Sequence, residues 1–357
     1  MKKRAFLTVI TKSYLAQART LAKSIRRFHD DPIFVLVVDG CEGYFDPSNE
    51  PFTVLQLGDV LPAGLEKMFF YYTPFELCNA ARPFLHKYLM ESTDADEWIY
   101  LDSDIYVLGS LEVVFEEFRG SQILLSPHQL GPATGPNRAA LEKPLLANGV
   151  YNSGFLGLSR GGGSAEFLRW FSDRLPEHCF HFAYGVFVDQ LWLNVAAQWF
   201  SPLGVVTHPG FNVAYWNLHE RRVRSAEGGG YTSNGKPLLF FHFSLWSSTQ
   251  PESITPAFWP GGAGSDCAEV REIGLAYRAE LLANGDEKCR QWPYVYAAFS
   301  DGTKIVPEMR RHYYELLLAG TAPRISPFEM GAYFRRFAAR RQLRRKAGRV
   351  FRRLAGA

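Results

Sequence analysis

The sequence predicts an α/β fold built on a mostly parallel sheet, and its first forty residues carry the prediction. Residues 5–10 form a short apolar run, residues 14–28 repeat apolar side chains at helical spacing, and residues 33–38 form a second apolar run. A strand, a helix and a buried strand in this order make a βαβ unit with a right-handed crossover. With 357 residues, 47% of them hydrophobic, the chain can bury a large core.

Strands and helices continue to alternate along the chain. Further strands are expected at 52–57, 98–101, 123–126, 155–158 and 238–243, and helices at 76–90, 165–175, 269–282 and 308–318. We expect a main α/β domain over 1–250, a mainly helical C-terminal extension over 251–334, and a basic amphipathic tail over 335–357. No P-loop is present, and no dinucleotide-binding glycine motif follows the first strand.

The tail holds most of the charge asymmetry. Residues 335–357 contain nine Arg and one Lys with no acidic residue, whereas the rest of the chain has 29 basic against 36 acidic residues. Its apolar residues recur at helical spacing, at Leu343, Ala347, Val350 and Leu354. This pattern is typical of a helix lying on an anionic membrane surface. A disordered basic tail or a nucleic-acid-binding arm is the alternative. The aromatic and aliphatic residues favour the membrane, so we expect no nucleic acid partner.

Targeting features point to a reducing, cytoplasmic setting. The five cysteines are scattered without CxxC spacing, which implies neither a disulfide framework nor a zinc site. The basic start Met1–Arg4 precedes an apolar run, but Thr11 and Lys12 interrupt it, so we expect no secretion signal. No segment reaches the ~20 apolar residues needed to cross a bilayer.

The most informative motif is Tyr100-Leu101-Asp102-Ser103-Asp104, at the end of a predicted buried strand. Along an extended segment Asp102 and Asp104 point the same way and Ser103 the other. Two carboxylates on one side suit Mg2+ or Mn2+ carrying a diphosphate. Asp-x-Asp alone is common, however, and the triplet by itself favours an acidic turn capping a helix that begins near Ser110.

Four further segments accompany the Asp pair. They are a helix with Arg82, the polar turn Asn152-Ser153-Gly154 opening a strand, Asp189-Gln190 at the head of a helix, and His242 late in an apolar strand. Taken singly, each has an ordinary explanation: Asp189 is placed as a helix cap, and a lone His in an apolar strand is usually a core residue.

In this order and at these separations, the segments resemble the GT-A glycosyltransferases, and most closely the retaining family 8-like group of nucleotide-sugar enzymes. The resemblance covers roughly residues 5 to 246. It implies a GT-A fold, a twisted Rossmann-like sheet with the donor cleft at the carboxyl ends of its strands, so that 1–250 would be the catalytic domain.

The resemblance also implies a role for each matching residue. Mn2+ or Mg2+ would be held by Asp102, Asp104 and His242. The donor would be bound by Thr8, Ile10, Thr11, Tyr14, Asp39, Arg82, Asp102, Ser103, Asn152 and Ser153. Asp189 and Gln190 would lie beside the anomeric carbon as the catalytic residues, with Asp189 acting as nucleophile or as orienting group.

Two parts of the chain depart from the family pattern. Residues 242–246 lack the lysine that would grip the diphosphate, so either Lys236, Arg221 or Arg222 replaces it or the donor is handled differently. The aromatic and amide-rich segment 209–222 is also outside the pattern, and its Tyr215 and Trp216 suit either sugar stacking or the core.

The expected function is that of a metal-dependent hexosyltransferase, moving a sugar with retention from a nucleotide-diphosphate donor, UDP being favoured, to a glycan or lipid-linked acceptor. With the basic tail, this favours surface-polysaccharide or lipopolysaccharide assembly at the inner face of a bacterial membrane. The alternatives are a non-catalytic membrane- or RNA-binding protein acting through the tail, and a sugar nucleotidyltransferase.

Overall fold

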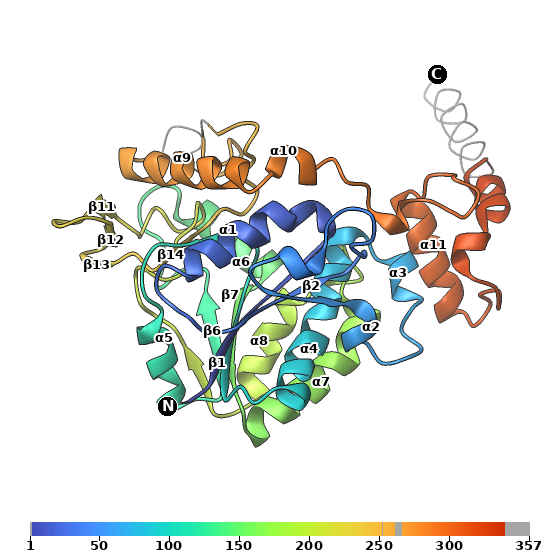
Figure 1. Cartoon of the computed structure of the whole chain (residues 1–357), viewed down its shortest axis with the longest axis horizontal. Coiled ribbons are helices and arrows are strands. Elements are labelled where there is room, and N and C mark those ends of the chain that lie inside the picture. Colours follow the sequence, from blue (N-terminus) through green and yellow to red (C-terminus); the bar gives the residue numbers. More distant parts are fainter. Residues whose placement is uncertain (1, 252, 261–265, 340–357) are drawn as a thin grey trace. The chain divides into compact units, whose positions relative to one another are not determined.

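The central feature of the computed structural model, which describes residues 2–251, 253–260 and 266–339, is a seven-stranded sheet flanked by helices (Figure 1). Its strands are β1 (Arg4–Ile10), β2 (Ile33–Val37), β3 (Thr53–Gln56), β4 (Glu97–Leu101), β6 (Ile123–Pro127), β7 (Tyr151–Ser159) and β10 (Leu203–Val205). They lie in the order β10-β6-β7-β4-β1-β2-β3, with β7 antiparallel to both neighbours and the other pairings parallel. The expected α/β class with a mostly parallel sheet is confirmed.

The helices largely follow the predicted apolar periodicity. They are α1 (Leu15–Ile25), α2 (Leu57–Val60), α3 (Met68–Tyr71), α4 (Pro74–Ser92), α5 (Glu112–Glu116), α6 (Arg138–Asn148), α7 (Gly162–His178), α8 (Gln190–Trp199), α9 (Ala268–Ala283), α10 (Asp286–Cys289) and α11 (Pro307–Leu318). Helix α6 is not predicted from the sequence because it contains Pro144 and buries only Leu141, so it has no apolar stripe.

The two faces of β4 bind different helices, which follows from the alternation of its side chains. Ile99 and Leu101 join the cluster that contains the apolar residues of α1. On the opposite face the indole Nε1 of Trp98 donates to Nδ1 of His86 in α4 (2.9 Å). Figure 1 shows α1 on one side of the sheet and α4 and α8 on the other. Helix α4 is thereby fixed against the strand that leads to Asp102.

A small antiparallel pairing extends the edge where β4 ends. Strand β5 (Ile105–Val107) pairs with β14 (Phe240–His242), with His242 opposite Ile105. Val213 forms a parallel bridge to Phe241 on the other side of β14. The remaining strands are β8 (His181–Ala183), β9 (Val186–Phe187), β11 (Val223–Ser225), β12 (Tyr231–Ser233) and β13 (Lys236–Pro237). Residues distant in the sequence therefore meet at one sheet edge.

The chain forms two compact units. The first comprises residues 1–61 and 78–292, and the second residues 62–77 and the chain from residue 293 on. Within the second unit, the guanidinium of Arg310 is buried and donates to the carbonyl oxygens of Phe70 and Tyr72 (2.5 and 2.9 Å). These limits differ from residues 250 and 334, and the expected division into domains stays a prediction.

The basic tail is described only as far as residue 339. Arg335 pairs with Asp301, and the ring of Phe337 stacks on His312 at 4.0 Å. Residues 340–357, on which most of the membrane-surface prediction rests, lie outside the described residues. In the part of the chain that the structure describes, no helix is long and apolar enough to cross a membrane.

The contact between Trp98 and His86 gives a test of how α4 is held. We expect His86→Leu to lower the free energy of unfolding by about 1–3 kcal/mol, because it leaves a buried indole N–H without an acceptor. His86→Gln, which offers an amide oxygen, should lose less; equal losses in urea denaturation of the two variants would contradict this role.

The same histidine predicts a pH effect. Burial, followed by the charge of Arg82, lowers the pKa of His86 from 6.5 to about 3. The unfolded chain therefore binds the proton more readily, and His86 makes the protein less stable as pH falls from 6.5 towards 3. This contribution should be missing from the pH profile of His86→Gln.

Candidate metal and sugar-nucleotide site

Asp102 and Asp104 lie in a turn between β4 and β5. The N–H of Ile105 donates to the carbonyl oxygen of Asp102 (3.1 Å), which closes the turn, and the N–H of Asp102 donates to the carbonyl oxygen of Gly154 in β7 (2.9 Å). The expected alternation of an extended strand is therefore wrong here, and the turn itself brings the two carboxylates together. The alternative, an acidic turn that caps a helix near Ser110, is wrong in its capping role: α5 does begin close by, at Glu112, but its N-cap residue is Leu111 and no side-chain cap hydrogen bond forms there.

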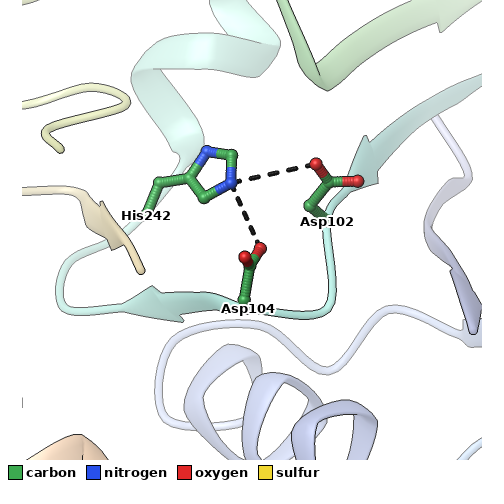
Figure 2. A group of neighbouring side chains, drawn as sticks. All are labelled: Asp102, Asp104 and His242. Atoms are coloured by element: carbon green, nitrogen blue, oxygen red, sulfur yellow. Dashed lines mark ion pairs between the residues drawn. The ribbon is translucent and has the colours of Figure 1, made fainter. Parts of the chain in front are cut away.

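His242 completes a cluster with these two carboxylates (Figure 2). Its Nε2 lies 3.1 Å from Oδ1 of Asp104 and 3.8 Å from Oδ2 of Asp102. One donor atom from each residue lies within 4.8 Å of the others. The histidine is buried, whereas the carboxylates keep 25% and 30% of their side-chain surface exposed. Two carboxylate oxygens and an imidazole nitrogen, open on one side, fit Mn2+ or Mg2+ with further ligands from phosphate and water.

The charges within the cluster are coupled. Burial opposes ionisation of Asp104, but the charge and hydrogen bond of His242 outweigh it and lower the pKa of the carboxyl. Burial likewise opposes protonation of His242, while Asp104 and then Asp102 raise its pKa. The two carboxylates thus favour a positive charge beside them, which a proton on the histidine or a bound cation would supply.

Arg82 joins the metal cluster to Asp189. Its Nη2 donates to Oδ1 of Asp102 (2.5 Å) and its Nη1 to Oδ2 of Asp189 (2.8 Å). The guanidinium lies over the ring of Tyr100 at 4.6 Å, and the Tyr100 hydroxyl donates to the same oxygen of Asp102 (2.7 Å). Asp102 therefore turns Oδ1 to the protein and Oδ2 to His242.

Asp189 precedes α8 but does not cap it. It occupies the N-cap position without a side-chain hydrogen bond to the helix. Instead Oδ1 accepts from the Ser153 hydroxyl (3.0 Å) and Oδ2 from Arg82. The preceding residue, Val188, has a φ of 39°, which is rare for a β-branched residue and marks a sharp local turn. Burial raises the pKa of Asp189 although Arg82 opposes the shift.

Asn152 and Ser153 lie inside β7 and not in a turn before it, which corrects the sequence expectation. The N–H of Ser153 donates to Oε1 of Gln190 (3.1 Å), and so does Nδ2 of Asn152 (3.3 Å). The predicted residues Arg82, Asp102, Asp104, Asn152, Ser153, Asp189, Gln190 and His242 are thus brought together by direct contacts.

Of the remaining residues predicted to bind the sugar donor, Thr8 and Ile10 lie in β1, Thr11 and Tyr14 follow it, Asp39 follows β2, and Ser103 lies in the turn between β4 and β5. All are buried except Tyr14, which is half exposed. Both oxygens of Asp39 accept bonds from Lys12, one from its backbone N–H (2.7 Å) and one from Nζ (2.9 Å). Burial, followed by the charge of Asp39, raises the pKa of the Cys78 thiol, while Arg82 opposes the shift.

Several buried polar atoms around the site have no hydrogen-bond partner among the described residues. They include the hydroxyl of Thr8, Nε of Arg82 and the indole Nε1 of Trp216. Buried donors are almost always paired, so such atoms mark places where a ligand or water completes the structure.

Of the residues considered as substitutes for the missing lysine, one is engaged in a backbone contact and two are exposed. Arg221 is buried and donates to the carbonyl oxygen of Pro209 (2.5 Å), while Arg222 and Lys236 are exposed. Trp216 is buried edge-on against the ring of His242, with centroids 5.1 Å apart.

Sequence reasoning missed Lys12 and Asn212. The pairing of Lys12 with Asp39 could have been predicted, because each residue lies two positions beyond the end of one of two neighbouring parallel strands. Asn212, described below, gave no signal of its own.

Comparisons with known proteins give distant similarities. No family model matches this chain. It is 29% identical over 251 residues to the uncharacterised protein YfnF of Bacillus subtilis, which covers 67% of this chain and 80% of YfnF. The glycosyltransferase GlyE of Streptococcus pneumoniae is similar in structure, with a TM-score of 0.45 and 18% identity, over 84% of this chain and 67% of GlyE. The galactosyltransferase LgtC has a TM-score of 0.41 and 14% identity, over 77% of this chain and 95% of LgtC.

Gly154 leaves the space that the cluster needs. A Cβ there would lie 2.5 Å from Cε1 of His242 and 2.8 Å from Oδ2 of Asp102. We expect Gly154→Ala to displace both side chains and weaken Mn2+ binding by more than about tenfold, the scale of losses caused by misplaced ligands. Gly162→Ala, where a Cβ meets open space, is the control. Calorimetric titration that found equal Mn2+ affinity in the two variants would count against the cluster as a metal site.

Proposed function

We propose that this protein is a metal-dependent glycosyltransferase that transfers a sugar from a nucleotide-diphosphate donor, a UDP-sugar, to a glycan or lipid-linked acceptor with retention. The observation that carries the proposal is the contact of Arg82 with both Asp102 and Asp189, which joins the cluster of Asp102, Asp104 and His242 to the buried side chain of Asp189. The ordered motifs that resemble the GT-A group support the same conclusion.

The proposed chemistry divides among the residues of the site. A divalent cation held by Asp102, Asp104 and His242 would stabilise the charge that develops on the leaving diphosphate. Arg82 supplies a fixed positive charge beside this position and keeps the two carboxylates from repelling each other. Asn152, Ser153 and Gln190 offer amide and hydroxyl groups for the hydroxyls of the sugar.

Asp189 is better suited to orient the sugar than to attack it. Each of its oxygens already accepts a bond, from Ser153 or from Arg82, and the side chain is buried. A carboxylate held in this way loses little entropy when it accepts a sugar hydroxyl. Its hydrogen bonds and its pairing with Arg82 withdraw charge from the oxygens and make them weaker nucleophiles. We therefore propose front-side attack by the acceptor, with Asp189 and Gln190 positioning the sugar.

The base and ribose of the donor would bind beside Thr8, Thr11, Tyr14 and Asp39. Because Lys12 already occupies both oxygens of Asp39, a contact from the base would add to a buried ion pair. We further propose that the acceptor belongs to surface-polysaccharide or lipopolysaccharide assembly. The protein would work at a membrane that it binds through residues 335–357. Mn2+-dependent hydrolysis within a panel of nucleotide sugars would identify the donor and separate this function from a binding protein or a nucleotidyltransferase.

The metal role of Asp104 has a direct test. We expect Asp104→Asn to lower Mn2+ affinity by more than about 100-fold, because removing a ligand costs more than removing its supporting group. Asp173→Asn, at an exposed aspartate on α7, is the control and should bind as the parent protein does. Unchanged calorimetric affinity of Asp104→Asn would remove this residue from the metal site.

Asp189 should act after metal binding. In Asp189→Asn we expect transfer, and hydrolysis of the donor, to fall by about 100-fold or more, since an orienting carboxylate is lost. Mn2+ affinity should stay near that of the parent protein because the cluster keeps all three ligands. Full turnover in this variant would exclude a catalytic role for Asp189, and lost Mn2+ binding would show that it only supports the cluster.

A further inference from the structure

Asn212 is buried beside the histidine of the cluster, in a segment outside the family pattern. It is 0% exposed and has a φ of 52°, a left-handed conformation that Asn, Asp and Gly tolerate. The N–H of His242 donates to the carbonyl oxygen of Val213 (2.8 Å), which aligns the two segments. Oδ1 of Asn212 lies 3.2 Å from Nδ1 of His242.

The direction of this contact follows from backbone groups whose polarity is fixed. The N–H of Ser153 can only donate, and the carbonyl of Asn148 can only accept. They contact opposite ends of the Gln190 amide, at 3.1 and 2.9 Å, so Oε1 of Gln190 must be the acceptor for Ser153. The orientation of the Gln190 amide is therefore settled.

The orientation of the Gln190 amide determines the orientations of the side-chain amides of Asn152 and Asn212. Because Oε1 of Gln190 accepts, the atom of Asn152 that faces it at 3.3 Å must be Nδ2. Oδ1 of Asn152 then faces Asn212 at 3.1 Å and requires a donor there, which is Nδ2 of Asn212. The remaining atom, Oδ1 of Asn212, can only accept, so Nδ1 of His242 carries a proton.

We propose that Asn212 is a positioning residue, which holds His242 with a proton on Nδ1, so that Nε2, the nitrogen that faces the two carboxylates, is the one left to bind the cation. The amides of Gln190, Asn152 and Asn212 form a chain that carries this polarity from the backbone to the metal ligand. His242 is thereby presented in the one neutral form that can bind a cation at Nε2. The inference rests on the proposed metal-dependent function.

Two substitutions distinguish the positioning of His242 by Asn212 from simple packing. Both residues introduced, Gly and Asp, tolerate the left-handed backbone at position 212. Asn212→Gly removes the acceptor, and we expect Mn2+ affinity to fall about 10- to 100-fold, as for other groups that orient metal-ligating histidines. Asn212→Asp keeps an acceptor for Nδ1–H, so Mn2+ affinity should stay close to that of the parent protein. Calorimetric titration of Mn2+ alone measures both, and thermal unfolding checks that each variant is folded.

The unsubstituted protein gives a second readout. The readout is the NMR spectrum of the Zn2+-loaded protein labelled with nitrogen-15 histidine. The signal of His242 is the one that is missing from the spectrum of His242→Gln. We expect a proton on Nδ1 and none on Nε2. A proton on Nε2, equal affinities of Asn212→Gly and the parent protein, or equal losses in Asn212→Gly and Asn212→Asp would each overturn the proposal. Failure of the unsubstituted protein to bind Mn2+ would instead overturn the metal site and, with it, the proposed function.

Discussion

The candidate site depends on one buried arginine. Asp102 and Asp189 come from different parts of the chain, and burying two carboxylates close together is unfavourable unless a cation pairs with both. Arg82 does so with its two terminal nitrogens. Burial opposes the charge of the guanidinium, but Asp102 and then Asp189 outweigh it and raise the pKa of Arg82 above its usual range. Its position on α4 is fixed one turn later by the contact of His86 with Trp98. The charge balance of the site is therefore linked to the packing of α4 on the sheet.

The sheet supplies the geometry that this balance requires. Because β7 runs antiparallel to β4, Phe155 lies opposite Leu101 and Asp102 is bonded to Gly154. Ser153 and Asn152 then follow on the same strand, within reach of Asp189 and Gln190. A parallel strand in this place would carry these residues to the opposite end of the sheet. The antiparallel direction of β7 thus brings Asn152 and Ser153 to the same edge of the sheet as Asp102.

The sequence predicts the main sheet well because its strands are apolar and its helices periodic. It does not predict the pairing of β5 with β14, since three-residue strands carry too little pattern; His242 was identified by family resemblance alone. For Asp189 the ordinary interpretation, a helix cap, is wrong because Arg82 and Ser153 compete for its oxygens. The contact of Asn212 with His242 could not be predicted from the local sequence, because it forms only when Val213 lies beside β14 in the folded protein.

Two connections join the cluster of Asp102, Asp104 and His242 to Asp189 and Gln190. Arg82 links Asp102 to Asp189, and the amide chain links His242 to Gln190. A cation bound by Asp102 would draw charge from that carboxylate and weaken its hold on Arg82, which strengthens the pairing of Arg82 with Asp189. This coupling acts through Arg82 and adds no ligand to the cation, so it is weaker than the direct contacts of the three ligands.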